Sequence, residues 1–134
     1  MKKLGEFYRE KVLSLPKKSL RKRETPYTFP ENMKIEKELF GWKIYYTEFR
    51  RKKLKFLECR SEEEARYLKV FFDSGMREVY VPKDDEYLKS ILPELEDLKK
   101  RTDEILNEYL EAVLNRGIKE RVRYEVFMEL TKVE

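Results

Sequence analysis

The chain has 134 residues and a mass of 16.5 kDa, which is the size of one ordinary domain. Charged residues make up 43% and hydrophobic residues 40%, and the net charge is +4, so we expect a single folded domain with a heavily charged surface. The lack of histidine and the single cysteine, Cys59, exclude histidine-based catalytic triads, an intrachain disulfide and a four-ligand zinc site.

The N-terminal quarter begins with a helical pattern. Apolar residues recur at helical spacing over residues 3–15, and Pro16 ends the pattern, so we expect a helix there. Residues 16–30 are basic and contain prolines, which predicts a surface arm. For residues 31–40 the pattern fits a short helix or a strand, and both alternatives stay open.

A β-hairpin is predicted over residues 42–60, where two aromatic and β-branched runs flank a basic turn. Pairing Phe49 with Leu54 would put four apolar residues on one face, which we expect to be the core face: Ile44, Tyr46, Leu57 and Cys59.

Two helices and a short strand are predicted to follow the hairpin. Ser61 and Glu64 form a capping box, which starts a helix that ends at Ser74-Gly75. Residues 77–81 are typical of a short strand. Asp84 or Asp85 can cap the next helical stretch, which Pro93 should break or restart, leaving a long helix near 94–116. Its apolar seam over 95–113 permits either packing within the chain or a homodimer.

The tail and the fold class complete the expected architecture. The apolar residues of 118–131 fit a strand over 120–130 better than a helix, although both readings remain open. The whole is expected to be an α+β domain over residues 1–134, in which a small, largely antiparallel sheet packs against helices.

Positive charge is concentrated in the first half of the chain. Residues 1–60 contain 18 Lys and Arg against 8 Glu, whereas residues 61–134 contain 13 against 19 Asp and Glu. Two acid-free clusters, within 17–23 and 50–55, account for most of this excess, which favours phosphates as ligands. The expected nucleic-acid-binding residues are Lys17, Lys18, Arg21, Lys22, Arg23, Lys43, Arg50, Arg51, Lys52, Lys53 and Lys55.

Aromatic residues of the hairpin are candidate stacking surfaces for bases, namely Tyr45, Phe49 and Phe56. The competing interpretation is that they lie beneath a helix, and we prefer it because large aromatic residues usually serve core burial.

Enzyme activity is not expected. The four glycines lie 34 to 42 residues apart, so the chain contains neither a P-loop nor a dinucleotide fingerprint. The predicted strands carry only acid-x-Arg, at Glu48–Arg50 and Glu58–Arg60, where a metal-dependent nuclease needs acid-x-Lys, and we expect neither a metal site, nor catalytic residues, nor a cofactor. The chain has no run of 18 apolar residues, which predicts a cytoplasmic protein that does not bind membranes. The abundance of Glu and Lys and the absence of Gln are typical of hyperthermophiles.

One family resemblance is carried by residues 56–115. The run from Phe56 to Leu68, then Val79 to Lys83 and a Leu-rich helix, resembles the C-terminal target-recognition region of adenine-specific DNA methyltransferases and of restriction-modification specificity subunits. The resemblance implies DNA contact without chemistry, and DNA rather than RNA. The strand predicted for 120–130 departs from the helix that would close such a region.

These observations predict a non-catalytic nucleic-acid-binding accessory protein. The alternative is a protein interaction module or a homodimeric structural protein that uses the seam over 95–113.

Overall fold

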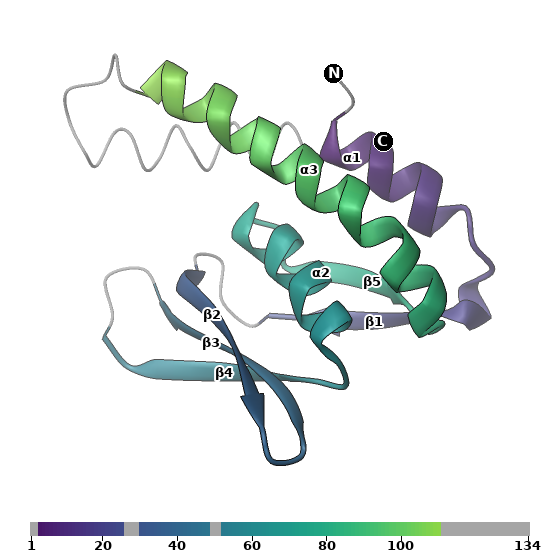
Figure 1. Ribbon diagram of the computed structural model, residues 1–134, viewed down its shortest axis with the longest axis horizontal. Coiled ribbons are helices and arrows are strands. Elements are labelled where there is room, and N and C mark those ends of the chain that lie inside the picture. The colour runs from purple at the N-terminus through teal and green to yellow at the C-terminus, as the bar shows by residue number, and fades with distance from the viewer. Residues whose placement is uncertain (1–2, 26–29, 49–51, 111–134) are drawn as a thin grey trace.

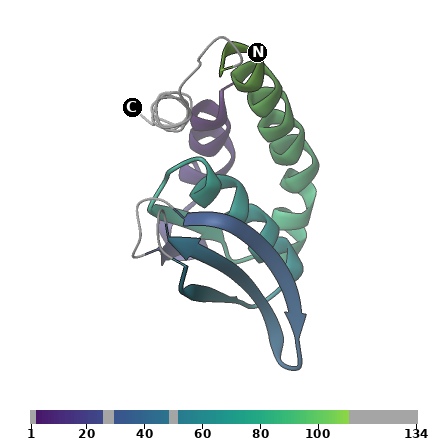
Figure 2. The ribbon, with the colours of Figure 1, turned by 90° about the vertical axis from the view of Figure 1, so that its left-hand side faces the viewer.

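The computed structural model describes residues 3–25, 30–48 and 52–110 of the chain, and the fold is α+β. Its helices lie on one side of its strands (Figures 1 and 2). Since residues 111–134 are outside the described part, the strand expected over 120–130 and the end of the helix expected to reach 116 also lie outside it.

The N-terminal helix agrees with the expectation from the sequence. Helix α1 (Leu4–Tyr8) continues into a π-helical turn (Arg9–Leu13), and its apolar stripe of Leu4, Phe7, Tyr8 and Val12 is buried. This stripe belongs to the main core, which α2 and α3 complete.

The five strands form two antiparallel sheets. The first pairs β1 (Leu20–Glu24) with β5 (Glu78–Pro82). In the second, β3 (Gly41–Glu48) lies between β2 (Pro30–Glu38) and β4 (Leu54–Cys59). Residues 20–24 of the expected surface arm are therefore a paired strand, and the open choice for residues 31–40 is resolved as a strand because β2 pairs along β3.

The predicted hairpin forms, with a register that differs by two residues from the expected one. Ile44 pairs with Leu57 and Tyr46 with Lys55, which leaves a longer turn after Glu48. Because a shift of two residues preserves the face of every side chain, the predicted core face is retained. Ile44, Tyr46 and Cys59 are buried as expected.

Helix α2 (Glu62–Asp73) begins where the capping signal predicts. Ser61 Oγ accepts a hydrogen bond from the Glu64 amide at 3.1 Å. The Glu64 side chain does not complete the capping box, because it forms ion pairs with two arginines instead. Helix α2 packs against α3 and against strands of both sheets, so it joins the two sheets.

Helix α3 (Asp85–Leu110) runs through Pro93 without a break, contrary to the expected restart at residue 94. Asp84 Oδ1 caps it by accepting a hydrogen bond from the Glu86 amide at 3.0 Å. Proline removes the amide that would bond to the carbonyl of Lys89, and both residues lie on the exposed side, where water can solvate that carbonyl.

Candidate nucleic-acid interface

The first basic cluster lies on the turn before β1 and on β1 itself. Lys17 and Lys18 are exposed on a 3-10 turn (Lys17–Ser19). The turn is held by the Ser19 amide, which donates to the Pro16 carbonyl at 2.9 Å, and by the Lys83 amide, which donates to the Ser19 carbonyl at 2.8 Å. Arg21 is also exposed, so three cations project from a backbone that is fixed in position.

Arg23, which the sequence predicts to contact phosphate, has a structural role instead. Its guanidinium is mostly buried, donates to the Glu58 carbonyl at 2.6 Å and forms an ion pair with the fully buried Glu64. Arg60 Nε lies 3.3 Å from the other carboxylate oxygen of Glu64. Arg23 is therefore engaged inside the protein and is not available to a ligand.

Lys22 and Tyr80 are cross-strand partners in the first sheet. Lys22 Nζ lies 3.1 Å from Glu24 and 3.6 Å from Glu78, and these carboxylates, Glu24 foremost, raise the pKa of the lysine. Tyr80 is partly exposed beside it. The sequence did not indicate this tyrosine as a surface residue, because a five-residue strand does not reveal which of its faces is exposed.

The second basic cluster lies at the turn between β3 and β4. Lys52 and Lys53 are exposed there, while Phe49, Arg50 and Arg51 lie outside the described residues. Lys55 Nζ lies 3.8 Å from a Glu48 carboxylate oxygen, so its charge is partly compensated.

The outer face of the three-stranded sheet exposes Phe56 and leaves Tyr45 half-buried, contrary to the preferred interpretation that a helix covers these aromatic residues. Phe56 is 50% exposed, and its ring lies 6.0 Å from that of Tyr45. Lys43 Nζ lies 4.2 Å from the centre of the Phe56 ring, a cation–π contact. The cause is topological, because the described helices pack on the opposite face of this sheet, where Ile44 and Tyr46 are buried.

Carboxylates surround the rings of Tyr45 and Phe56. The Tyr45 hydroxyl donates a hydrogen bond to Glu38, and this bond raises the pKa of the tyrosine. Lys43 has Glu36 as its neighbour on β2 and Glu58 as its neighbour on β4. The outer face is therefore mixed in charge and not a continuous basic platform.

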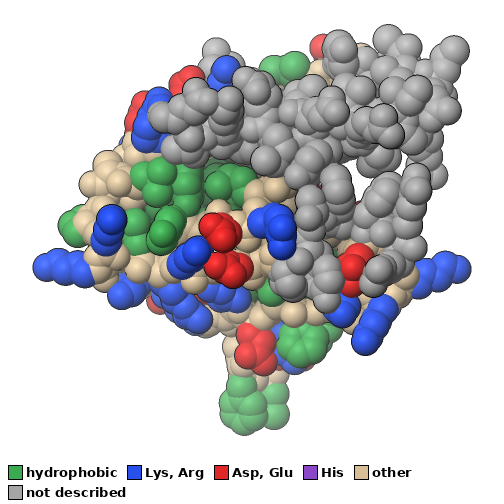
Figure 3. Space-filling view, turned by 180° about the vertical axis from the view of Figure 1, so that it is seen from behind, with side chains coloured by type: hydrophobic (Ala, Val, Ile, Leu, Met, Phe, Trp, Pro, Cys, Tyr) green, Lys and Arg blue, Asp and Glu red, His purple; other side chains and the backbone are tan. Residues whose placement is uncertain are grey.

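The two basic clusters lie at opposite ends of the molecule. In Figure 1 the 3-10 turn that precedes β1 is at the right, and the start of β4 is at the left. Seen from behind, Lys and Arg side chains extend from both ends, with acidic side chains between them (Figure 3). Within the described residues, the two clusters thus form two separate basic ends.

Metal-binding clusters and the reactivity of the cysteine can be assessed within the described ranges 3–25, 30–48 and 52–110. No group of three Cys, Asp or Glu side chains there could hold a metal ion. Burial foremost, and then the charge of Glu64, raises the pKa of the Cys59 thiol from 9.0 to about 12, so this cysteine is not an activated nucleophile. No helix in these ranges is both long and apolar enough to cross a membrane.

Comparison of the chain with protein families, with curated proteins and with solved structures gives no match.

Proposed function

We propose that the protein binds nucleic acid without catalysing a reaction on it, and that its two basic ends contact phosphates. The observation that supports this most is a set of exposed cations that have no acidic partner in the described part of the chain. These are Lys17, Lys18 and Arg21 at one end and Lys52 and Lys53 at the other. Cations of this kind release the counterions that are condensed on a phosphate backbone, which drives binding.

The end that contains Lys17 is the stronger candidate. Its turn is fixed by backbone hydrogen bonds, and Lys83 adds a further exposed ammonium, whose Nζ donates to the Lys18 carbonyl at 2.9 Å. A cation on a fixed backbone loses less conformational entropy on binding than one on a free arm.

The ligand we favour is duplex DNA. Binding of single strands depends on bases stacking over aromatic rings in a positive groove, whereas Glu36, Glu38 and Glu58 lie around Tyr45 and Phe56 and would repel a phosphate backbone. Contact through phosphates alone suits a duplex. The resemblance of residues 56–115 to DNA target-recognition regions favours DNA over RNA.

The test compares two triple variants on a labelled duplex at several salt concentrations. Replacement of Lys17, Lys18 and Arg21 by alanine should weaken binding and reduce the magnitude of the salt slope by about 3, because each of these side chains neutralises about one phosphate. The control replaces Lys89, Lys100 and Arg101 by alanine, which removes the same charge from exposed positions on α3 and should leave the slope nearly unchanged. Equal effects of the two triple variants would contradict the proposed interface.

The alternative expected from the sequence, a homodimer through residues 95–113, receives no support from α3. Of the seam residues, Leu95, Leu98 and Thr102 are already buried within a single chain, whereas Ile105 is 53% exposed. The part of the seam over residues 111–113 lies outside the described residues. The described part of the seam therefore offers little apolar surface to a partner beyond Ile105.

A further inference from the structure

The two basic ends are far apart because β1 and β4 extend to opposite sides of the point where they meet. At this point the Arg23 guanidinium donates a hydrogen bond to the Glu58 carbonyl at 2.6 Å. Lys18 precedes Arg23 by five residues on one side. Lys53 precedes Glu58 by five residues on the other side, where β4 begins (Figure 1). At about 3.3 Å per residue of extended chain, the two basic ends lie about 30 Å apart.

Cations on the strands between the two ends lie beside carboxylates. Lys22 Nζ on β1 lies 3.1 Å from a carboxylate oxygen of Glu24 and 3.6 Å from one of Glu78, so two anions share one cation. On β4, Lys55 Nζ lies 3.8 Å from a carboxylate oxygen of Glu48. A phosphate backbone that followed these strands would therefore meet a neutral or negative surface.

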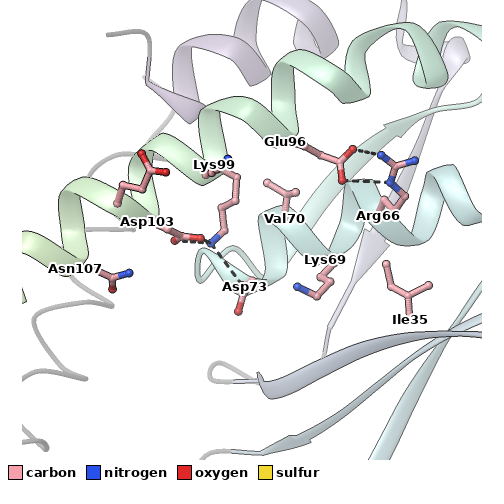
Figure 4. Close-up of a pocket in the computed structure, with 11 residues that line it drawn as sticks. Ile35, Arg66, Lys69, Val70, Asp73, Glu96, Lys99, Asp103 and Asn107 are labelled. Atoms are coloured by element: carbon pink, nitrogen blue, oxygen red, sulfur yellow. Dashed lines mark hydrogen bonds and ion pairs between the residues drawn. The ribbon is translucent and has the colours of Figure 1, made fainter.

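The groove between α2 and α3 also carries cations, but its charge is balanced. Its lining residues include four cations and four anions, and ion pairs form among them (Figure 4). Arg66 Nε donates to Glu96 at 3.2 Å, and Lys99 Nζ donates to Asp103 at 2.7 Å. Such a surface does not attract a phosphate backbone, which makes Lys100 at its rim a suitable control position.

The two basic ends face away from each other. Lys and Arg side chains project outward from both extremes of the molecule (Figure 3). The described cations are Lys17, Lys18 and Arg21 at one end and Lys52 and Lys53 at the other. Duplex DNA is stiff, with a persistence length of about 50 nm, so a duplex bound at one end does not bend round to reach the other.

We infer that one copy of this protein bridges two DNA duplexes, one at each basic end. The inference rests on the proposed function, because it specifies how many duplexes the two ends contact. A bridging copy neutralises phosphates on both duplexes and releases counterions from both.

The competing arrangement is a single duplex that contacts both ends. A straight duplex repeats its phosphates once per helical turn, about 34 Å, which is close to the spacing of the ends. To use this spacing, however, the duplex would have to lie along β1 and β4, where Glu24 and Glu78 would repel its backbone. The charges between the ends therefore favour two duplexes.

The experiment uses one duplex fixed to beads and a second, fluorescently labelled duplex in solution, at about 50 mM salt, where phosphate contacts are strong. The unmodified protein should retain the labelled duplex on the beads. Retention should pass through a maximum as the protein concentration rises, because excess protein occupies each duplex with separate copies.

Two variants each remove one basic end. One has alanine at Lys17, Lys18 and Arg21, and the other has alanine at residues 50–53, which are all basic. Each should reduce retention of the labelled duplex at least about 10-fold, while fluorescence anisotropy still detects binding of a single duplex through the remaining end. The control is the triple alanine variant of α3 that includes Lys100, and it should retain the labelled duplex as the unmodified protein does.

The outcomes separate this inference from the proposed function. Binding of single duplexes without retention of a second one would overturn bridging alone, whereas no binding of any duplex would overturn both. Retention that survives alanine at residues 50–53 would contradict the inference, since one basic end would then suffice. Loss of single-duplex binding in both end variants would also contradict it, because it would place one duplex across both ends.

Discussion

Glu64 connects elements that are distant in sequence, because its buried carboxylate lies between the guanidinium groups of Arg23 on β1 and Arg60 after β4. We predict that Glu64→Gln lowers the free energy of unfolding by about 3–5 kcal/mol, since it leaves buried arginine charge without its partner. Denaturant unfolding followed by circular dichroism measures the change.

The control for this substitution is Glu62→Gln, which removes an exposed carboxylate from the same turn of α2. It should cost no more than about 1 kcal/mol, the contribution of a favourable interaction with the helix dipole. Similar losses for the two variants would contradict the role assigned to Glu64.

Burial also determines the chemistry of Cys59, whose thiol pKa rises from 9.0 to about 12. Because the folded protein holds this proton to a higher pH than the unfolded chain does, the thiol's contribution to stability is complete below pH 9 and is lost as the pH rises from 9 towards 12. At pH 9 we predict that iodoacetamide alkylates the native thiol more than about 100-fold more slowly than the thiol of the denatured chain. Comparable rates would show that Cys59 is accessible and ionised.

The sequence alone could not separate the role of Arg23 from that of its basic neighbours. Arg23 belongs to the same basic run as Arg21, and only the three-dimensional position of Glu64, 41 residues further along the chain, separates their roles. No local pattern contains that information. The exposure of Lys17 and Lys18, in contrast, is predicted correctly from their charged neighbours.

At the scale of elements, local signals predicted most of the fold. Capping residues located the start of α2, and alternation of apolar residues located β3 and β4 with the correct core face. The hairpin register and the strand character of residues 30–38 were not determined, because both depend on pairing with β3. Pro93 does not break α3, contrary to the expectation. The carbonyl of Lys89, which lacks its amide partner because of the proline, lies on the exposed side of the helix, where water can solvate it.

The hydroxyl groups of two tyrosines form hydrogen bonds with the backbone amide and carbonyl of Tyr80 on β5. The Tyr80 amide donates to the Tyr8 hydroxyl at 2.8 Å, and the Tyr67 hydroxyl donates to the Tyr80 carbonyl at 2.7 Å. We predict that Tyr67→Phe lowers the free energy of unfolding by about 1–2 kcal/mol, because this carbonyl loses its partner.

Thermal unfolding measures this effect, with Tyr45→Phe as the control. The Tyr45 hydroxyl binds Glu38 on the outer face of the sheet, and its loss should change stability by less than about 0.5 kcal/mol. An equal loss of stability in Tyr45→Phe would contradict the role assigned to the Tyr67 hydroxyl.

In the folded molecule, the positive charge of the first half of the sequence lies at two basic ends, and carboxylates lie between them (Figure 3). The sequence predicted that the clusters exist, but their separation follows from the division of the strands into two sheets. The cations on β1 also have a structural use, since β1 pairs only with β5 in the described sheets and charge on an edge strand opposes aggregation.

Binding of a labelled DNA duplex to the unmodified protein, measured between about 50 and 200 mM salt, tests the central claim most directly. If Lys17, Lys18, Arg21, Lys52 and Lys53 contact phosphates, the logarithm of the association constant should fall linearly with the logarithm of the salt concentration, with a slope of about −3 to −5. The absence of binding at the lowest salt concentration would contradict the claim, and it would leave protection of the β1 edge as the role of the first cluster.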